Sequence, residues 1–245
     1  MADERKDIHN SEVPVVCRSC EARHRGICGV LEPDQLLELS KYTKRSTFGE
    51  SEEIVSNEEQ ILRYSNILSG VVKLSKLLVD GRQQIVGLQF APDFLGRPFK
   101  ATSDTTVEAV TDVRVCSFPK SVLESLIRKS PELEHILHEQ TLRELDDARN
   151  WMMTLGRKSA SEKVASFLYL IGQNINPENE ATNAHTSFDI PLKRADIADF
   201  LGLTIETVSR QLTKLRKSGV ISIINNRSVN IPDMNALKRA CEENR

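Results

Sequence analysis

Residues 191–220 read PLKRADIADFLGLTIETVSRQLTKLRKSGV, and this stretch decides the fold of the C-terminal part of the chain. Its first apolar residues share one face of a short helix; they are Ile197, Ala198 and Leu201. Gly202 interrupts the pattern, and the hydroxyl of Thr204 can cap a second helix. That helix has apolar residues at helical spacing, which predicts one buried side formed by Ile205, Val208, Leu212 and Leu215. Helix, glycine turn and helix together predict a helix-turn-helix, whose second helix lies in the major groove of DNA.

The other side of the second helix carries groups suited to DNA. Arg donates two hydrogen bonds to guanine, Glu accepts one from cytosine N4, and Ser or Thr serves either role. Basic side chains nearer the C-terminal end suit phosphates, which set position and affinity rather than sequence choice. The predicted DNA-contacting residues are Glu206, Thr207, Ser209, Arg210, Lys214 and Lys217. From these residues alone, an ordinary amphipathic hairpin with a solvated charged face fits equally well.

These residues resemble the DNA-reading helix of the CRP/FNR regulators, whose E-x-x-S-R signature stands here as Glu206, Ser209 and Arg210. The resemblance extends from Cys17 to about Leu237. It implies a transcription activator that binds palindromic promoter sites of TTGAT type on double-stranded DNA, forms a homodimer and contacts RNA polymerase. After the reading helix, residues 221–231 alternate around Asn225-Asn226, which predicts a hairpin wing beside the DNA.

The bulk composition describes a soluble globular protein with room for two domains. The chain has 245 residues, of which 39% are hydrophobic and 28% charged, and its net charge is −2. No apolar run approaches the ~18 residues that a membrane span requires, and the charged N-terminus MADERKDIHN has no signal segment. We therefore expect a cytoplasmic protein without membrane contact.

Strand and turn signals fill residues 43–118. Alternating apolar residues flank Asp80-Gly81, a strong tight-turn pair, and further short strands are expected at residues 53–55, 106–110 and 113–118. Several short antiparallel strands indicate a barrel or jelly roll. The hairpin SGVVKLSKLLVDGRQQIVGLQF resembles the effector domain of the CRP/FNR family, which implies a cyclic-nucleotide-binding-like β-roll.

A long helical pattern begins at Pro131 and continues to about Leu155. Residues repeat with a three-and-four spacing typical of a coiled-coil seam, and the predicted dimer interface is His138, Thr141, Leu145, Ala148, Met152 and Leu155. Leu133, Ile136 and Leu137 lie off this seam and are expected to pack on the β-roll. The alternative is a helix buried within its own subunit. A short hinge is expected at residues 156–161, then a helix over 161–171 and a loop over 174–187.

Three cysteines occur within twelve residues of the segment CRSCEARHRGIC. Cys17 and Cys20 form a C-x-x-C pair, and Cys28 follows after seven residues. The segment has too little apolar content for a regular element, so we expect a loop shaped by a bound cation, either zinc or an iron–sulfur cluster. A [4Fe–4S] cluster needs four ligands, and Cys116 at the end of a predicted strand is the candidate fourth. A local zinc site of Cys17, Cys20, Cys28 and His24 would leave Cys116 without a role.

Three N-terminal cysteines with a distant one before Ser117-Phe118 resemble the FNR branch, the oxygen-responsive regulators of fumarate and nitrate reduction. The resemblance implies that Cys17, Cys20, Cys28 and Cys116 hold a [4Fe–4S] cluster that controls dimerisation and DNA binding, regulating genes under low oxygen. The seven-residue gap is a departure, because spacing varies between branches. Cys241 matches no family ligand and is expected to be a free thiol. The alternative is a zinc-stabilised or small-molecule-responsive DNA-binding regulator.

Other function classes are disfavoured. Cyclic-nucleotide binding needs a Gly-Glu pair and a later Arg-Ser/Thr pair to hold the cyclic phosphate. The corresponding segment here is FAPDFLGRPFKATSDTTVEAV. Arg97 is present, but no Glu follows Gly96 and no Arg precedes the Thr pair. We therefore expect no cyclic nucleotide. A dithiol enzyme would need a thioredoxin-like context around the C-x-x-C pair, and no catalytic triad or phosphate-cradling loop is evident, so we expect no enzyme.

The predicted fold class is α+β, with a β-roll, a long dimerisation helix and a winged helix-turn-helix. The predicted domains are residues 1–30 as a cysteine-rich arm, 31–130 as the β-roll sensor, 131–158 as the dimerisation helix and 159–245 as the DNA-binding domain.

Overall fold

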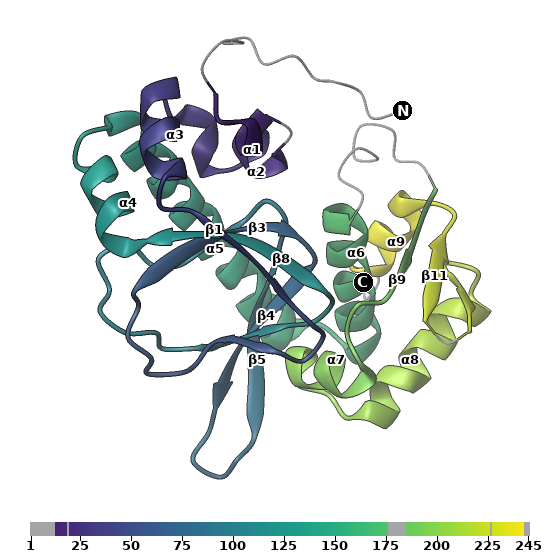
Figure 1. The fold of residues 1–245 in the computed structure, drawn as a ribbon. Coiled ribbons are helices and arrows are strands. Elements are labelled where there is room, and N and C mark those ends of the chain that lie inside the picture. The colour runs from purple at the N-terminus through teal and green to yellow at the C-terminus, as the bar shows by residue number, and fades with distance from the viewer. Residues whose placement is uncertain (1–12, 19, 176–184, 226, 243–245) are drawn as a thin grey trace. The chain divides into compact units, whose positions relative to one another are not determined.

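The computed structural model describes residues 13–18, 20–175, 185–225 and 227–242. It divides the chain into two compact units, one of residues 1–76 and 87–145 and the other of residues 77–86 and 146–245 (Figure 1). Residues 1–12 of the predicted arm, and most of the predicted 174–187 loop, lie outside the described residues. None of the helices in the described ranges has the length and hydropathy needed to cross a bilayer.

Two four-stranded sheets build the β-roll. One sheet is formed, in spatial order, by β1 (Lys44–Phe48), β8 (Val113–Pro119), β3 (Arg63–Ser69) and β6 (Phe94–Leu95). The other is formed by β2 (Glu53–Val55), β7 (Thr106–Ala109), β4 (Val71–Leu77) and β5 (Gln83–Phe90). Apolar residues of both sheets share one core, namely Ile67, Val113 and Val115 with Val72, Val107 and Ala109. This arrangement confirms the predicted β-roll.

The turn at Asp80-Gly81 is formed as predicted. The Leu78 N–H donates to the Arg82 carbonyl at 2.8 Å and so closes the β4–β5 hairpin. Gly81 has a φ of 85°, a left-handed conformation that glycine adopts without steric cost. The Asp-Gly pair therefore predicted the turn because glycine can adopt the backbone conformation that the turn requires.

The cysteine segment is more regular than predicted. It contains two short α-helices, α1 (Val15–Arg18) and α2 (Glu21–Arg25), and a 3-10 helix, η1 (Ile27–Val30). The prediction of a loop was wrong, because Ala22 and Ile27 are both buried and give the segment an apolar anchor of its own. Gly26 lies so close to the backbone of Pro92 that a Cβ there would be 3.0 Å from its carbonyl oxygen, so only glycine fits without adjustment.

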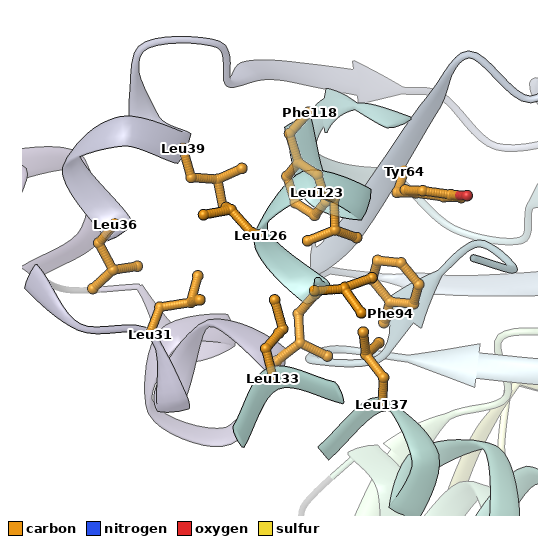
Figure 2. Packing of buried hydrophobic residues seen from close by; sticks show 12 residues of the cluster. Leu31, Leu36, Leu39, Tyr64, Phe94, Phe118, Leu123, Leu126, Leu133 and Leu137 are labelled. Atoms are coloured by element: carbon orange, nitrogen blue, oxygen red, sulfur yellow. The ribbon is translucent and has the colours of Figure 1, made fainter. Parts of the chain in front are cut away.

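A second core joins this segment to the helices of the first unit. Helix α3 (Pro33–Ser40) precedes the strands of the β-roll, and α4 (Lys120–Ile127) follows them. Figure 2 shows side chains of α3, α4 and the sheet converging with Leu133 and Leu137. The cluster also includes Ile27, and Cys28 packs against it. The cysteine segment and the start of the long helix therefore share one hydrophobic core.

The long helix α5 runs from Pro131 to Arg157. Its start is fixed by Ser130, whose Oγ accepts a hydrogen bond from the Leu133 N–H at 3.3 Å, and by proline at the first helical position. Leu133 and Leu137 are buried and Ile136 packs beside them, as predicted. All residues from 141 to 150 are exposed in the single chain.

The predicted dimer seam lies largely on this exposed part of α5. Within the single chain His138, Thr141, Leu145, Ala148 and Met152 are exposed, and Leu155 is half-buried. The expected hinge at residues 156–161 is shorter than predicted, since α5 continues through Gly156 and the next helix begins at Ala160. A Cβ added at Gly156 would have no atom within 4 Å, so no close contact requires glycine at this position of α5.

The second unit holds the helix-turn-helix and its wing. Its elements are α6 (Ala160–Ile175), β9 (Thr186–Asp189), α7 (Arg194–Leu201), α8 (Ile205–Lys217), β10 (Ser222–Ile224), β11 (Ser228–Ile231) and α9 (Met234–Ala240). The strands pair in the order β10-β11-β9, so the wing is three-stranded and includes β9, whose first two residues fall within the predicted 174–187 loop. The inward side of α6 is buried, including Val164, Phe167, Leu168 and Ile171, as predicted.

Candidate metal centre and nucleic-acid interface

The turn between α7 and α8 has the geometry that the sequence predicted. Gly202 adopts a left-handed conformation with φ 61° and ends α7, its N–H donating to the Ala198 carbonyl. The Thr204 Oγ1 accepts a hydrogen bond from the Thr207 N–H at 3.2 Å and begins α8. Three of the four predicted inward residues of α8 are buried, namely Val208, Leu212 and Leu215. Ile205 was wrongly placed among them: it is 47% exposed, because it is the first residue of the helix and lies at its uncovered end.

The residues predicted to contact bases stand on the accessible side of α8. Glu206, Ser209 and Arg210 are exposed and Thr207 is half-buried. Hydrogen bonds from the backbone and from Thr204 lower the pKa of the Glu206 carboxyl, so it is ionised and acts only as an acceptor. The Arg210 Nη2 donates to the Thr207 Oγ1 at 3.3 Å, which restrains the guanidinium along the helix.

Basic groups gather at the other end of α8. Its last turn contains Lys214, Arg216 and Lys217, all of them exposed. Cations at a helix C-terminus are favoured by the helix dipole and are free to reach phosphates. The helix therefore separates hydrogen-bonding side chains at its start from cations at its end.

The structure brings the four predicted cysteine ligands into one neighbourhood of the first unit. Cys17 lies in α1, Cys20 precedes α2, Cys28 lies in η1 and Cys116 lies on β8. The charge of Cys116 would act on Cys28, and the charges of Cys17 and Cys20 would act on Cys28 and Cys116. All four are half-buried free thiols. Cys116 is thus not isolated from the N-terminal three.

Burial is the main influence on these thiols. It raises the pKa of Cys28 to about 12 and that of Cys116 to about 11, and it also raises the pKa of Cys17. The neighbouring thiolates raise each pKa further, since like charges repel. Without a bound cation, these three cysteines are therefore protonated at neutral pH.

Positive and hydrogen-bonding groups act in the opposite direction. Arg45 and Arg63 lower the pKa of Cys116, and Arg23 with Arg45 lowers that of Cys17. Arg23 of α2 is thus one of the cations that favour the thiolate of Cys17, while Arg18 donates to the Val13 carbonyl. Arg45 and Arg63 were missed because they lie on β1 and β3, far from the cysteine segment in sequence.

Strand register explains why these groups meet. Across the sheet, Cys116 on β8 is the partner of Arg45 on β1 and of Asn66 on β3. Paired residues point to the same side of a sheet. The Asn66 Nδ2 also donates to the Cys28 Sγ at 3.2 Å. A row of cation, thiol and amide therefore lies beside η1.

The four cysteines have the chemistry of ligands for a sulfur-bound metal centre and lie in one neighbourhood, but their sulfur atoms are not spaced to bind a metal in this structure. Among the described residues, no group of three or more His, Cys, Asp or Glu side chains is spaced to hold a metal ion. His24, the alternative zinc ligand, is exposed, and its Nε2 lies 3.4 Å from the Arg18 carbonyl oxygen. Four thiols with nearby arginines and an amide donor suit a thiolate-bound cluster. Binding of a metal centre would require these thiols to come closer together.

The β-roll also encloses a cavity of about 380 Å³. Its lining combines apolar residues such as Phe48, Leu74 and Val107 with polar ones. Arg97, the one matching residue of a cyclic-phosphate site, faces Asp104, with its Nη1 3.2 Å from Oδ2. That guanidinium is thus already paired within the chain.

Cys241 belongs to the second unit, whereas the other four cysteines belong to the first. It follows α9 in the second unit, is 6% exposed, and its Sγ donates to the Leu237 carbonyl at 3.2 Å. It is a free thiol, as expected.

Two known families match different parts of the chain. Residues 162–240 match the family described as "Crp-like helix-turn-helix domain", and residues 45–130 match the family described as "Cyclic nucleotide-binding domain". The first range contains α7 and α8, and the second contains the β-roll with Cys116.

Individual proteins are similar over almost the whole chain. A "Probable transcriptional activator" of Rhizobium leguminosarum bv. viciae is 52% identical over 96% of this chain and 97% of its own length. The "Transcriptional activator protein FnrL" of Cereibacter sphaeroides is 36% identical over 91% of each chain. Among solved structures, that of FixK2 from Bradyrhizobium japonicum has a TM-score of 0.72 and 30% identity, over 81% of this chain and 96% of its own.

Proposed function

Because this chain belongs to the CRP/FNR family of transcription regulators, we propose that it is an oxygen-responsive activator in the cytoplasm whose Cys17, Cys20, Cys28 and Cys116 hold a [4Fe–4S] cluster. When bound, such a cluster supplies an oxygen-labile link between the N-terminal segment and strand β8. The single observation that carries the proposal is the interaction of Cys116 with the three N-terminal cysteines, beside Arg45 and Asn66.

The path from this centre to the DNA begins in the shared core of the first unit. Cys28 packs against the cluster of buried residues that contains Leu133 and Leu137 of α5 (Figure 2). Contacts that hold η1 against β8 therefore also stabilise the core in which the start of α5 packs. Release of the cysteine segment would loosen this core and the helix that follows it.

Dimerisation is the step at which a change in α5 would act. The exposed seam residues Leu145 and Met152 would be buried against a second copy, while Asp146 and Asp147 would oppose association. The pKa of Asp147 is raised by partial desolvation and by the neighbouring charge of Asp146, in keeping with crowded acidic groups. A weakly favoured dimer is shifted by a few kcal/mol, so small changes at the start of α5 suffice.

In the dimer, two copies of α8 would lie about one DNA turn apart on a palindrome. Glu206, Ser209 and Arg210 would read half-sites of the TTGAT type that the family resemblance implies. Lys214 and Lys217 would contact phosphates, and the DNA-bound dimer would contact RNA polymerase.

The β-roll cavity favours a second candidate function. A space of about 380 Å³ with apolar and polar lining can take a small effector, so the chain would then be a small-molecule-responsive or zinc-stabilised regulator without an oxygen-labile cluster.

Iron and acid-labile sulfide analysis of anaerobically purified protein tests the first proposal. Operator binding is measured on the same samples before and after exposure to air. We expect iron and sulfide in near-equal amounts, tight DNA binding before air and weak binding afterwards. A colourless zinc protein with the same operator affinity in air would favour the second candidate.

Two serine variants sharpen this test. Cys116→Ser removes a proposed ligand on β8 and should abolish both iron content and the response to air. Cys241→Ser changes a buried thiol of the second unit and should leave both intact. Undiminished operator affinity when Cys17, Cys20, Cys28 and Cys116 are all replaced by serine would contradict the proposal.

A further inference from the structure

Asn66 is a buried polar residue that core packing does not explain. It lies on β3 between β8 and β6, and only 1% of its surface is accessible. Its Nδ2 donates to the Cys28 Sγ at 3.2 Å, while its Oδ1 is buried and has no hydrogen-bond partner among the described residues. Burying an amide with an unpaired oxygen costs stability, so an apolar residue would suit a purely structural position better.

The Cys28 sulfur that accepts this hydrogen bond suggests a function for Asn66. A neutral thiol is a weak acceptor, whereas a thiolate is a strong, charged one. The bond from Asn66 to Cys28 is therefore strongest when the sulfur carries negative charge, as it does on a metal. The amide is set to stabilise the ligand form of Cys28.

The place of Asn66 in the sheet adds a second observation. It is the direct cross-strand partner of Cys116, so one side chain stands beside one cysteine and donates to another. Cys28 comes from η1 and Cys116 from β8, which are 88 positions apart in the sequence (residues 28 and 116). Asn66 thus links the two elements that a common metal centre would have to join.

We propose that Asn66 is a positioning residue of the cysteine centre, which holds Cys28 next to Cys116 and stabilises the Cys28 thiolate by an N–H···S hydrogen bond. The proposal rests on the proposed function only in taking Cys28 and Cys116 as ligands of one centre. It does not depend on whether that centre is a cluster or a single metal ion.

Anaerobic titration of the reduced, metal-free full-length protein with Co²⁺ tests this role. Sulfur-to-cobalt charge-transfer absorbance reports the number of thiolates bound. Asn66→Leu keeps the side-chain size but removes the donor, and we expect about tenfold weaker Co²⁺ binding with lower charge-transfer intensity, as for other groups that orient metal ligands. In anaerobically purified protein, the same variant should lose iron to a chelator several-fold faster.

Ser65→Ala is the matched control. Ser65 is the neighbour of Asn66 on β3, and its Oγ is hydrogen-bonded to the Ser117 Oγ at 2.7 Å in the adjacent rung of the same ladder. The Ser65→Ala variant therefore loses a part-buried hydrogen bond between β3 and β8 on the side of the sheet opposite to Asn66. We expect its Co²⁺ affinity and rate of iron loss to equal those of the unchanged protein.

The outcomes separate the two proposals. Equal Co²⁺ affinity in Asn66→Leu and the unchanged protein would overturn the role of Asn66, and so would an equal loss in Ser65→Ala. Weaker Co²⁺ binding in Asn66→Leu, together with native protein that lacks iron and sulfide, would support Asn66 and overturn the cluster. If Asn66→Leu does not fold, Asn66→Asp decides, since it has the same shape but a carboxylate beside the thiolates. Undiminished Co²⁺ binding by Asn66→Asp would overturn the inference.

Discussion

Trp151 of α5 and Phe200 of α7 are in ring contact within the second unit, with centroids 4.5 Å apart and planes inclined by 56°. Phe167 of α6 approaches Phe200 edge-on at 6.1 Å. The end of the long helix is thereby joined to the first helix of the helix-turn-helix. Aromatic pairs of this kind contribute about 0.5–1.5 kcal/mol beyond the area they bury.

Replacement of Trp151 by alanine should therefore loosen the second unit. We expect Trp151→Ala to lower the free energy of unfolding by about 2 kcal/mol, less than for a fully buried ring because Trp151 is half-buried. Denaturant unfolding followed by circular dichroism measures this, because the protein's only tryptophan is lost. Met153→Ala, at a residue 56% exposed, should change stability by less than about 0.5 kcal/mol. Equal effects of the two variants would contradict the aromatic link.

The cap of the reading helix should matter for stability and for DNA binding. Thr204→Ala removes the acceptor for the Thr207 N–H and should cost about 1 kcal/mol. Operator affinity should fall as well, because the first turn of α8 carries side chains proposed to read bases. Thr204→Ser keeps the acceptor and should restore most of both. A serine variant as impaired as the alanine variant would argue against the cap.

Arg210 and Lys214 should differ in what they recognise. Arg210→Ala should cost about 1–3 kcal/mol on the cognate duplex and relax base preference, whereas Lys214→Ala should weaken all sequences alike and lower the salt dependence. Fluorescence anisotropy with cognate and scrambled duplexes at several salt concentrations measures both. Equal losses on the two duplexes for Arg210→Ala would refute its role in reading bases.

Two adjacent methionines of α5 distinguish a dimer seam from a merely exposed surface. Met152 belongs to the predicted seam and Met153 does not, yet both are exposed in the single chain, by 73% and 56%. Met152→Glu would bury a charge between subunits and should weaken dimerisation at least tenfold, or about 1.4 kcal/mol. Met153→Glu should leave it unchanged. Analytical ultracentrifugation over a concentration series measures both, and a similar result for the two would contradict the seam.

The buried thiols predict a loss of stability at alkaline pH in the metal-free protein. Folding raises the pKa of Cys28 from 9.0 to about 12 and that of Cys116 to about 11. The folded state therefore favours the protonated thiols, and their contribution is complete below pH 9 and lost as the pH rises towards the folded pKa values. As the pH rises through this window, each of these thiols should decrease the free energy of unfolding by about 1.4 kcal/mol per pH unit, because only the unfolded state loses the proton. Denaturant unfolding at pH 8–10.5 measures this: the free energy of unfolding should decline less steeply with pH for Cys28→Ser than for the unchanged protein. An equal decline in the two proteins would contradict the role of Cys28.

The same protonation state determines the response to metal. Cys17, Cys28 and Cys116 are protonated at neutral pH, so metal binding must displace their protons. Calorimetry of Zn²⁺ binding in buffers of different ionisation enthalpy should show the release of about three or more protons, and the affinity should increase with pH. A proton release near zero would mean that these thiols are not the ligands.

Local patterns predicted much of the fold. The helix-turn-helix was predicted down to its cap and glycine turn, because Gly202 and Thr204 act through backbone conformation and hydrogen bonds within a few residues. The Asp80-Gly81 hairpin and the buried side of α6 followed from turn chemistry and periodicity in the same way. Ile205 was misplaced because periodicity does not show where a covering neighbour ends.

The residues around the cysteine centre show what the sequence by itself determined and what only the tertiary structure decided. The sequence determined which side chains can donate sulfur, and through Ala22 and Ile27 it contained the anchor of a segment that looked too polar to be regular. Only the pairing of β1, β8 and β3 decided that Arg45 and Asn66 flank Cys116. Only the shared core decided that Cys28 packs against the cluster to which Leu133 and Leu137 belong. The physical reason is that register and core contacts join residues far apart in the chain, and no local spacing encodes which of them will meet.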